Sequence, residues 1–307
     1  MATAVLADRQ AISRPSTLRE RLDLSRRMTF IAALVVVLLV GLLLSFIAWN
    51  GIQLFIRSAV PLLSILSPDW APSTDQFGIL PFVLGTIGVM IVAAIIATPL
   101  SVGLALFIAE VAPGWARNVI RPAMEIFVGI PSVVYGWLGL TILVPFLRTN
   151  LHSVGFNIGY SWFAGSLVLA LMVLPTIASI SYDALVAVPD DLRQASLALG
   201  TTRWQTLRHM LLKAASTGIM TAVVLGMMRA AGEALAVQMV IGNRPVVPTS
   251  LTQPMTTLTS QITLDMGNTV GGSAWNDALW TMGLVLLLMS LGFVSLVRYL
   301  GRRSQLR

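Results

Sequence analysis

The sequence predicts an all-α polytopic membrane protein. Of its 307 residues, 56% are hydrophobic and only 11% are charged, with a mean hydropathy of +0.83. A soluble domain carries about 25% charged residues, so this chain lacks the side chains that would cover a water-facing surface. Six apolar segments are long enough to cross a bilayer as helices, which takes about 20 residues. The basic residues are also distributed very unevenly between the loops.

Composition excludes several other classes of protein. The absence of cysteine rules out disulfides, thiolate zinc sites and cysteine nucleophiles. The only two histidines, His152 and His209, are not in an H-E-x-x-H frame. The net charge of +7 does not indicate nucleic-acid binding, because a membrane protein is often basic for topological reasons. We therefore expect no catalytic residue, no metal site and no nucleic-acid partner.

The six apolar segments differ in how they are interrupted. Proline removes a helix hydrogen bond, so the second helix is expected to begin near Pro81 and to bend at Pro99. The third segment is interrupted by Pro131, and the fifth contains Arg229 and Glu233. The expected segments are 28–49, 77–109, 126–147, 162–182, 214–243 and 278–297.

The first apolar segment is expected to be an uncleaved helix. A secretory signal peptide has an apolar run of about 7–15 residues, and the run 28–49 is longer. No convincing small-x-small cleavage site follows it. The expected organisation is an N-terminal tail at 1–27, the first helix and an outer loop at 28–77, and a helical core at 78–300 that includes a loop at 183–213.

The positions of lysine and arginine predict the orientation. With both termini in the cytoplasm, all but four of the 20 basic residues lie in the cytoplasmic tails and loops. Cytoplasmic loops of membrane proteins are enriched in these residues, and the reverse topology would invert the bias. The sequence therefore predicts an N-in, C-in protein. The four exceptions are Arg57, Arg148, Arg229 and Arg244.

The long cytoplasmic loop 183–213 has the pattern of two short helices. Pro189 followed by two acidic residues favours a helix start, and Gly200 suits the position after a helix end. Thr202 and Gln205 form a capping box that would open the second helix. A DNA-binding helix-turn-helix and an ordinary solvated loop are the alternatives. Tethering to the membrane at both ends disfavours the first.

Residues 194–200 resemble the E-A-A-x-x-x-G loop of ABC importer permeases, which docks into the ATPase subunit. Gln194 replaces the usual Glu, and Ser196 replaces the second Ala, whereas Ala195 and Gly200 match. Residues 210–213 (MLLK) depart from the usual I-x-L-P ending. The resemblance implies that Gln194, Ala195, Ser196 and Gly200 couple this chain to an ATPase.

The chain itself lacks a P-loop. Such a loop needs Gly-Lys-Ser/Thr to hold phosphates, and the single lysine, Lys213, follows Leu212. We therefore expect a transporter subunit without its own ATP site and without a cofactor. ATP would be hydrolysed by a partner subunit.

Several further motifs resemble the phosphate ABC importer permeases, and the PstC-like form more than the PstA-like form. They are the region 70–113, the segment 129–136 (GIPSVVYG), and 229–233 (RAAGE) followed by 239–243 (MVIGN). Small residues in these segments also suit close helix packing, which explains each motif locally but not their order. The resemblance covers residues 50–300.

This resemblance implies a type I ABC importer permease fold in the inner (plasma) membrane, surrounded by lipid, that translocates inorganic phosphate. The implied partners are a PstA-like permease subunit, a dimer of ATP-binding subunits and a periplasmic phosphate-binding protein. Rival hypotheses are a permease for sulfate, molybdate or phosphonate, and the PstA-like half. An intramembrane protease, suggested by Tyr182-Asp183, and a non-transporting scaffold belong to other classes.

Arg229 and Glu233 are the candidate residues of the substrate pathway. A charge at the bilayer centre costs about 2.5–3.5 kcal/mol on insertion scales, so its presence suggests function. Glu233 lies one helical turn after Arg229, where the two could pair. A guanidinium matches an oxyanion, and a nearby carboxylate would favour release. The alternative is a salt bridge that only neutralises the arginine. Glu125 is a weaker candidate, expected at the interface.

The outer loop 244–277 is rich in Thr, Ser and Pro and carries little net charge. A short amphipathic helix is expected around residues 255–264. The resemblance implies that this loop faces the binding protein.

Overall fold

The computed structural model describes residues 16–58 and 60–304, and the side chains of 26–58 and 60–295. The chain divides into two compact units, residues 1–50 and residues 51–307. The predicted organisation, with boundaries at residues 27 and 77, stays a prediction. Helix α1 (Ser16–Arg57) begins before residue 28, so residues 16–27 of the predicted tail are helical. The rest of the predicted tail, 1–15, lies outside the described residues.

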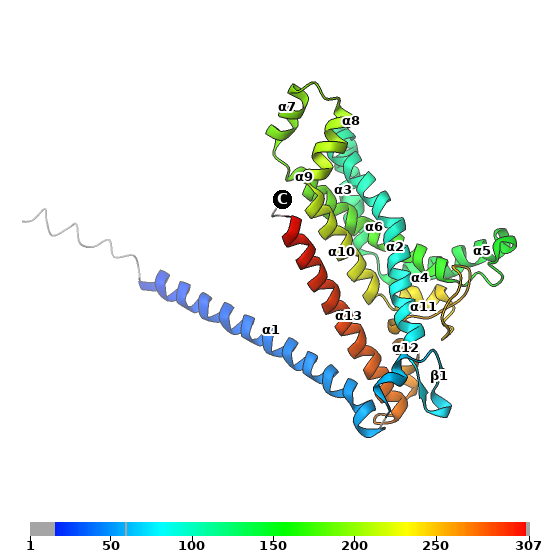
Figure 1. The fold of residues 1–307 in the computed structure, drawn as a ribbon. Helices are drawn as coiled ribbons and strands as arrows, with labels where there is room; N and C mark the ends of the chain where they lie inside the picture. The colour runs from blue at the N-terminus through cyan, green and yellow to red at the C-terminus, as the bar shows by residue number, and fades with distance from the viewer. Residues whose placement is uncertain (1–15, 59, 305–307) are drawn as a thin grey trace, which may run out of the picture. The chain divides into compact units, whose positions relative to one another are not determined.

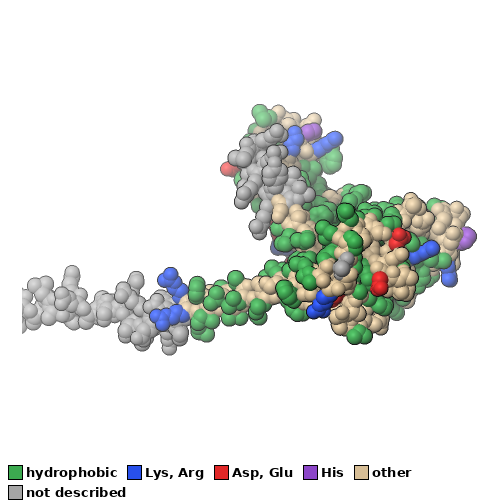
Figure 2. Space-filling model, turned by 60° about the horizontal axis from the view of Figure 1, so that its bottom comes forward, with side chains coloured by type: hydrophobic (Ala, Val, Ile, Leu, Met, Phe, Trp, Pro, Cys, Tyr) green, Lys and Arg blue, Asp and Glu red, His purple; other side chains and the backbone are tan. Residues whose placement is uncertain are grey.

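The first unit consists of the greater part of α1. Its apolar side chains have no protein neighbours to bury them: Val37 and Leu42 are each 67% exposed. Figure 2 shows these side chains along the helix, with basic side chains gathered at the N-terminal end of the part whose side chains are described. A helix that exposes apolar residues on every side needs hydrocarbon or another protein around it.

The second unit is built around helices α2 (Leu80–Leu106), α6 (Trp162–Val186) and α10 (Ser216–Gly232) (Figure 1). Small residues such as Ala93, Ala97 and Ala178 are fully buried in this core. A buried alanine or glycine lets two helix backbones approach closely, which is the usual way in which membrane helices pack. The long helix α13 (Ala274–Ser304) follows α12 in the chain and packs against α10 and α12.

The remaining elements of the second unit are short. They are η1 (Leu62–Leu66), β1 (Trp70–Ala71), η2 (Pro72–Thr74), β2 (Gln76–Phe77), η3 (Phe107–Val111), α3 (Gly114–Gly129), α4 (Ser132–Leu138), η4 (Gly139–Leu143), α5 (Val144–Asn150), η5 (His152–Val154), α7 (Asp190–Ala198), α8 (Arg203–Gln205), η6 (Thr206–Leu211), α9 (Leu212–Ala214), α11 (Leu235–Ile241), α12 (Leu258–Asp265) and η7 (Met266–Asn268). Of these, η3, η4 and η6 are π-helical turns.

Five helical segments of the described chain are long and apolar enough to cross a membrane, and a sixth is possible if a pair bent by 67° counts as one span. The prediction of six apolar segments is compatible with this result. The five segments are Arg26–Arg57, Leu80–Val111, Ser132–Asn150, Trp162–Val186 and Ala274–Ser295, and the bent pair is Arg203–Ala214 with Ser216–Gly232.

Two of the predicted segments differ from the structure. The third was expected at 126–147, but residues 126–129 belong to the separate helix α3, and the spanning helix begins at Ser132. Pro131 causes this break, because it lacks an N–H and forces Ile130 into an extended conformation. The fifth was expected to be one helix over 214–243, but it is interrupted at Glu233.

The loop 183–213 folds as predicted into two short helical segments. Helix α7 begins after Pro189, and Gly200 follows it with a φ of +79°. Thr202 and Gln205 form both hydrogen bonds of a capping box. Within the second unit, Figure 1 places α7 and α8 at one end and α12 and β1 at the opposite end.

Helix α12 lies near the position predicted for a short amphipathic helix in the outer loop. Its first residues are buried, so this part of the helix has no exposed polar face. Leu258 and Ser260 are fully buried. Gly85 of α2 faces the backbone just before this helix, where a β-carbon would overlap the carbonyl oxygen of Thr256. The close approach of α12 to α2 therefore requires a glycine at this position.

We expect Gly85→Ala to destabilise the protein by about 1–3 kcal/mol, the usual cost of forcing an extra methyl group into a packed core. Gly103→Ala is the matched control, because it lies in the same helix with no neighbouring atom within 4 Å. Thermal unfolding of the purified protein in detergent would measure both. Equal stability of the two variants would contradict this packing.

Candidate functional site

Helix α3 ends at a break in the chain just before the third spanning segment. Its last carbonyls have no partner within the helix, as at every helix C-terminus. The hydroxyl of Tyr135 donates to the carbonyl of Phe127 at 2.9 Å. The guanidinium of Arg229 donates through Nη2 to the carbonyl of Val128 at 3.4 Å. One end of α3 is therefore bonded to both α4 and α10.

Arg229 has a second partner on α6. Its Nη1 donates to the hydroxyl oxygen of Thr176 at 3.1 Å. These two bonds use two of the five N–H groups of a guanidinium. The other three have no acceptor among the described residues, and the side chain is only partly buried. Arg229 is thus oriented by the protein while most of its donors remain available to an anion.

The charge of Arg229 is balanced mainly by dipoles. The C-terminal end of a helix carries a partial negative charge of about half an elementary charge. The carbonyl of Val128 belongs to this end of α3, and the Thr176 hydroxyl adds a further dipole. Neither of these two partners carries a full negative charge, so neither forms an ion pair with the guanidinium.

The predicted pairing of Arg229 with Glu233 is wrong in this structure. Among the described residues, no ion pair joins them. Helix α10 ends at Gly232, and Glu233 is extended, with φ −78° and ψ 123°. The spacing of one turn that would bring the two side chains together therefore no longer applies. The carboxylate of Glu233 is partly buried and has no hydrogen-bond partner in the described part of the chain.

The break at Glu233 is held from the α12 side. The hydroxyl of Thr259 donates to the carbonyl of Glu233 at 2.9 Å. Helix α12 is itself attached to α2, because the amide of Leu258 donates to the hydroxyl oxygen of Thr86 at 3.0 Å. Both hydroxyl groups lie on residues that are at least nine-tenths buried. Helix α12 therefore fixes the position of the interrupted fifth segment.

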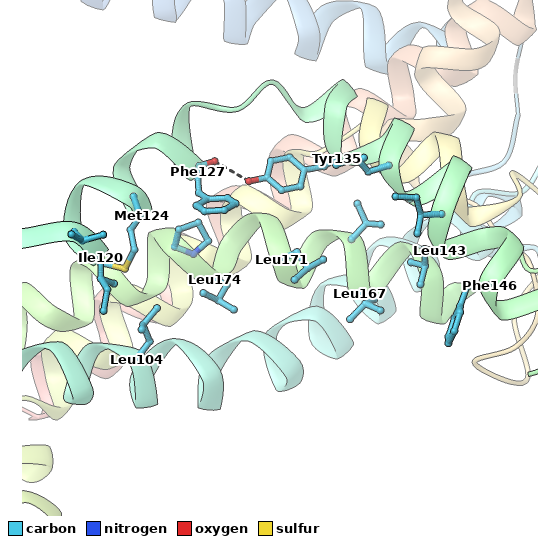
Figure 3. Close-up of a pocket in the computed structure, with 17 residues that line it drawn as sticks. Leu104, Ile120, Met124, Phe127, Tyr135, Leu143, Phe146, Leu167, Leu171 and Leu174 are labelled. Carbon is cyan, nitrogen blue, oxygen red and sulfur yellow. Dashed lines mark hydrogen bonds between the residues drawn. The ribbon is translucent and has the colours of Figure 1, made fainter. Parts of the chain in front are cut away.

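An apolar cavity of 680 Å³ lies beside this site, between α2, α3, α4, η4 and α6 (Figure 3). Its lining is almost entirely hydrocarbon, and includes Leu104, Met124 and Leu171. The hydroxyl of Tyr135, a polar group in its wall, is already bonded to Phe127. The cavity therefore offers no group that would bind an anion, and we do not assign it to the substrate.

The predicted coupling residues lie together at the α7 end. Gln194, Ala195 and Gly200 are exposed, and Ser196 is partly buried. The hydroxyl of Ser196 lies 2.9 Å from that of Thr201 and 3.1 Å from that of Thr206. The hydroxyl that distinguishes Ser196 from the alanine of the family pattern is therefore used to join α7 to the following helical segment.

Apolar side chains project from this end of the molecule. Leu199 is 85% exposed and Trp204 is 66% exposed. Large apolar side chains exposed in one loop are typical of a surface that another protein covers. The coupling role of the loop 183–213 stays a prediction.

Glu125, the weaker candidate, lies on α3 and is exposed. Its carboxylate is 3.9 Å from the guanidinium of Arg121, and the two side chains are 68% and 53% exposed. An exposed pair at this distance contributes about 0–1 kcal/mol. The structure places Glu125 in no contact with Arg229 or Glu233. Among the described residues, no group of three or more His, Cys, Asp or Glu side chains is arranged to hold a metal ion.

The helices of membrane-spanning length, with a partly buried arginine where two interrupted segments meet, indicate a multi-span membrane protein. Comparison with known proteins gives the family. A family model described as "Binding-protein-dependent transport system inner membrane component" matches residues 101–305. The chain belongs to this family, and it is a multi-pass inner-membrane permease subunit of a binding-protein-dependent ABC importer.

Two relatives and one solved structure illustrate the similarity. The chain is 51% identical to the "Probable ABC transporter permease protein YqgH" of Bacillus subtilis, over 85% of this chain and 84% of that protein. It is 34% identical to the "Phosphate transport system permease protein PstC" of Mesorhizobium japonicum, over 90% and 88%.

Among solved structures, a bacterial alginate ABC transporter in complex with an alginate pentasaccharide-bound periplasmic protein matches with a TM-score of 0.63. The identity is 15%, over 92% of this chain and 96% of that chain. This match shows the fold, which is that of a type I ABC importer permease.

Three residues that hold the site together were not predicted from the sequence to do so. Thr176, Tyr135 and Thr259 each provide a single hydroxyl, and each acts on a residue at least eight positions away in the chain. No local pattern reveals such a contact. The break at Glu233 had a detectable signal, because the predicted fifth segment was 30 residues long and crossing a bilayer takes about 20.

We expect Thr259→Val to destabilise the protein by about 1–3 kcal/mol, because it leaves the carbonyl of Glu233 without its donor in a buried position. Thr259→Ser keeps the hydroxyl and should retain most of the stability. Thr263→Val is the control in the same helix: its exposed hydroxyl donates only to the carbonyl of Thr259. If all three variants unfold at the same temperature in detergent, Thr259 does not hold the break.

Proposed function

We propose that this chain is the PstC-like permease subunit of a phosphate importer. Arg229 is the observation that carries the proposal, because it presents unused N–H donors where two interrupted membrane segments meet. The relative from Mesorhizobium japonicum is named a phosphate transport permease, whereas the name of the more similar Bacillus protein states no substrate. The chemistry of the site must therefore support the choice of anion.

Phosphate suits this site better than sulfate does. A guanidinium binds a tetrahedral oxyanion through paired N–H donors. At neutral pH phosphate still carries at least one proton, and the free carboxylate of Glu233 is an acceptor for that P–OH group. Sulfate has no such proton, and its oxygens would be repelled by the carboxylate. The absence of an ion pair between Arg229 and Glu233 leaves each side chain available for its own part of the anion.

The proposed orientation has both termini in the cytoplasm, supported by the distribution of basic residues. In this orientation the α7 end is cytoplasmic, and the α12 end faces the periplasm. Gln194, Ala195, Ser196 and Gly200 would then contact an ATPase. This chain contributes no ATP site of its own, since it contains no Gly-Lys-Ser/Thr sequence.

The proposed partners are a PstA-like permease subunit, a dimer of ATP-binding subunits and a periplasmic phosphate-binding protein. The family description names a binding-protein-dependent system, and the matched alginate transporter is in complex with a periplasmic protein. The exposed apolar side chains of the loop 183–213 support an ATPase contact. The exposed apolar surface of α1 supports contacts with lipid or with the second permease.

Arg229→Gln is expected to lower phosphate uptake by at least about a hundredfold, because losing a charge-assisted bidentate contact costs about 3 kcal/mol or more. Glu233→Gln should keep phosphate uptake measurable but increase inhibition by sulfate. It should not change stability, because no ion pair is lost. Arg148→Gln, at an exposed position in α5, is the control.

Uptake of labelled phosphate into proteoliposomes that contain the complete complex would measure these effects, with and without excess sulfate. Phosphate uptake by Arg229→Gln at the wild-type rate, in a complex that assembles normally, would refute the role of this residue. Sulfate inhibition of Glu233→Gln at the wild-type level would refute discrimination by the carboxylate.

Gly200→Val should uncouple ATP hydrolysis from uptake while leaving the protein inserted in the membrane. The positive φ of Gly200 costs a side chain about 1–2 kcal/mol, although no atom obstructs a β-carbon there. Gly200→Val is therefore expected to change the backbone conformation of the turn that follows α7. Gly200→Asn is the control, because asparagine adopts this left-handed conformation much more readily than valine does and should retain most of the coupling. Normal uptake per ATP hydrolysed in Gly200→Val would show that the turn is not needed for coupling.

A further inference from the structure

Specific polar contacts connect helix α7 to the rest of the protein. None of its nine residues is fully buried, and its leucines Leu192 and Leu197 are 46% and 45% exposed. The hydroxyl of Ser196 lies close to that of Thr206 within the same loop. Arg193 connects α7 to the membrane helices. Because α7 has no fully buried side chain, these polar contacts are the specific links through which a displacement of α7 can reach the membrane-spanning part of the chain.

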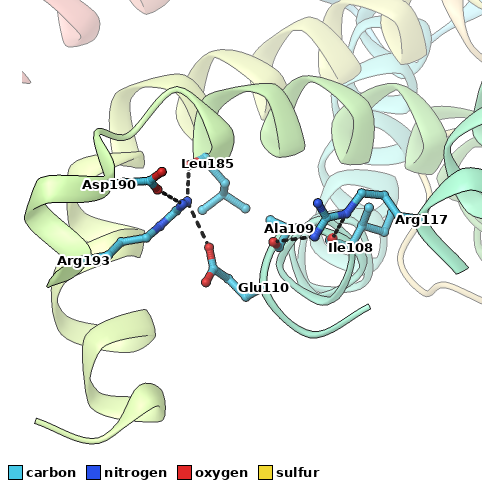
Figure 4. A network of polar contacts seen from close by, with 7 residues as sticks. All are labelled: Ile108, Ala109, Glu110, Arg117, Leu185, Asp190 and Arg193. Atoms are coloured by element: carbon cyan, nitrogen blue, oxygen red, sulfur yellow. Dashed lines mark hydrogen bonds and ion pairs between the residues drawn. The ribbon is translucent and has the colours of Figure 1, made fainter. Parts of the chain in front are cut away.

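Arg193 contacts three different elements (Figure 4). Its Nη2 lies 3.0 Å from Oε1 of Glu110 in η3 and donates to the carbonyl of Leu185, near the end of α6, at 3.1 Å. Its Nη1 lies 2.7 Å from Oδ1 of Asp190 in α7 itself. The side chains of Arg193 and Glu110 are about three-quarters buried, at 25% and 26% exposed, whereas Asp190 is 76% exposed. Water therefore screens the contact with Glu110 less than the one with Asp190.

The turn that carries Glu110 is held from its other side by α3. Helix η3 is a π-helical turn, in which an extra residue disturbs the usual hydrogen-bond ladder. The carbonyls of Ile108 and Ala109 accept hydrogen bonds from Nε and Nη2 of Arg117, each at 3.1 Å. Arg117 belongs to the first turn of α3 (Figure 4). The ion pair of Glu110 thus connects α7 to both α2 and α3.

The opposite end of α3 reaches the candidate substrate site. Its second-last residue, Val128, accepts the hydrogen bond from Arg229. Helix α6 offers a parallel route, because Leu185 near its end contacts Arg193 and Thr176 near its middle contacts Arg229. Helices α3 and α6 therefore both link the residues around Arg193 to the residues around Arg229. Both routes start at the side chain of Arg193.

We infer that the ion pair between Arg193 and Glu110 is the positioning contact by which α7 moves α2 and α3 together during the transport cycle. This inference rests on the proposed role of α7 as the ATPase-docking helix. It assigns a function to two residues that neither contact the substrate site nor belong to the residues matched to the coupling pattern. In this arrangement α7 and η3 stay in contact throughout the cycle.

The first test is the amount of substrate imported per ATP hydrolysed by the complete complex in proteoliposomes. Glu110→Gln should lower this ratio about tenfold, corresponding to a coupling free energy of about 1.4 kcal/mol. Asp190→Asn should leave the ratio unchanged, because this partner of the same arginine lies on α7 itself. Arg193→Lys keeps the charge and should retain part of the coupling, whereas Arg193→Gln should not.

The double variant Glu110→Gln with Arg193→Gln separates a specific contact from general damage. If the two residues act through each other, it should be no worse than Arg193→Gln alone. Additive losses would contradict the inference, and so would an equal loss in Asp190→Asn. An unchanged ratio in Glu110→Gln would refute it directly.

The second test does not depend on the substrate. The native chain has no cysteine, so Glu110→Cys with Arg193→Cys provides the only two thiols in this subunit. A short bifunctional thiol reagent should join them equally well in the nucleotide-free complex and in the complex trapped with ATP and vanadate. The joined complex should still hydrolyse ATP, and each single-cysteine variant serves as its control.

The two proposals fail in different ways. Loss of joining in the trapped state, or loss of ATP hydrolysis on joining, would show that α7 separates from η3 and would overturn the inference. Failure of the wild-type complex to import phosphate would refute the proposed substrate alone, because the thiol test gives its result without it. The thiol test also gives a result if Glu110→Gln assembles poorly.

Discussion

Hydrocarbon offers no hydrogen-bond partner, so a backbone break at membrane depth persists only where the protein satisfies the freed groups. This constraint explains the arrangement around Arg229. The carbonyls at the end of α3 receive donors from Tyr135 and Arg229, and the carbonyl of Glu233 receives one from Thr259. The two breaks therefore stabilise each other, since the arginine of one interrupted segment satisfies the backbone of the other.

This arrangement also explains how a charged side chain is tolerated there without a neutralising carboxylate. A full ion pair between Arg229 and Glu233 would cancel the field that attracts an anion. A helix end and a hydroxyl orient the guanidinium through partial charges, and they leave most of its N–H groups unused. These unused donors are the basis of the proposed oxyanion site, and the family to which the chain belongs is one of binding-protein-dependent transport systems.

Local patterns in the sequence predicted local structure well. The capping box of Thr202 and Gln205, the turn at Gly200 and the helix start after Pro189 are confirmed, because each depends on residues within a few positions of one another. The apolar segments were also found, since span length and hydropathy follow directly from the bilayer.

Predictions that needed a helix to continue were less successful. The pairing of Arg229 with Glu233 assumed an unbroken helix through Gly232, and the third span was placed too early because Pro131 was treated as an interruption instead of a start. The break at Glu233 is held by a contact from a distant residue, whereas the break before Ser132 follows from Pro131 itself. The contacts that hold both breaks in place come from distant residues. Thr259 and Val128 lie 26 and 101 positions from their partners, so no periodicity could reveal them.

Helix α3 shows how contacts at the ends of one element connect two functions. It has 16 residues and a length of about 24 Å, with Arg117 in its first turn and Val128 near its last residue. An α-helix is stiff along its axis, so a displacement of one end is transmitted to the other with little loss. The side-chain contacts at the two ends of α3 are deformed more easily than the helix itself. Under the proposed roles of α7 and Arg229, energetic coupling between them depends on a few polar contacts. These contacts, rather than the helices between them, are where substitutions should alter transport without altering the fold.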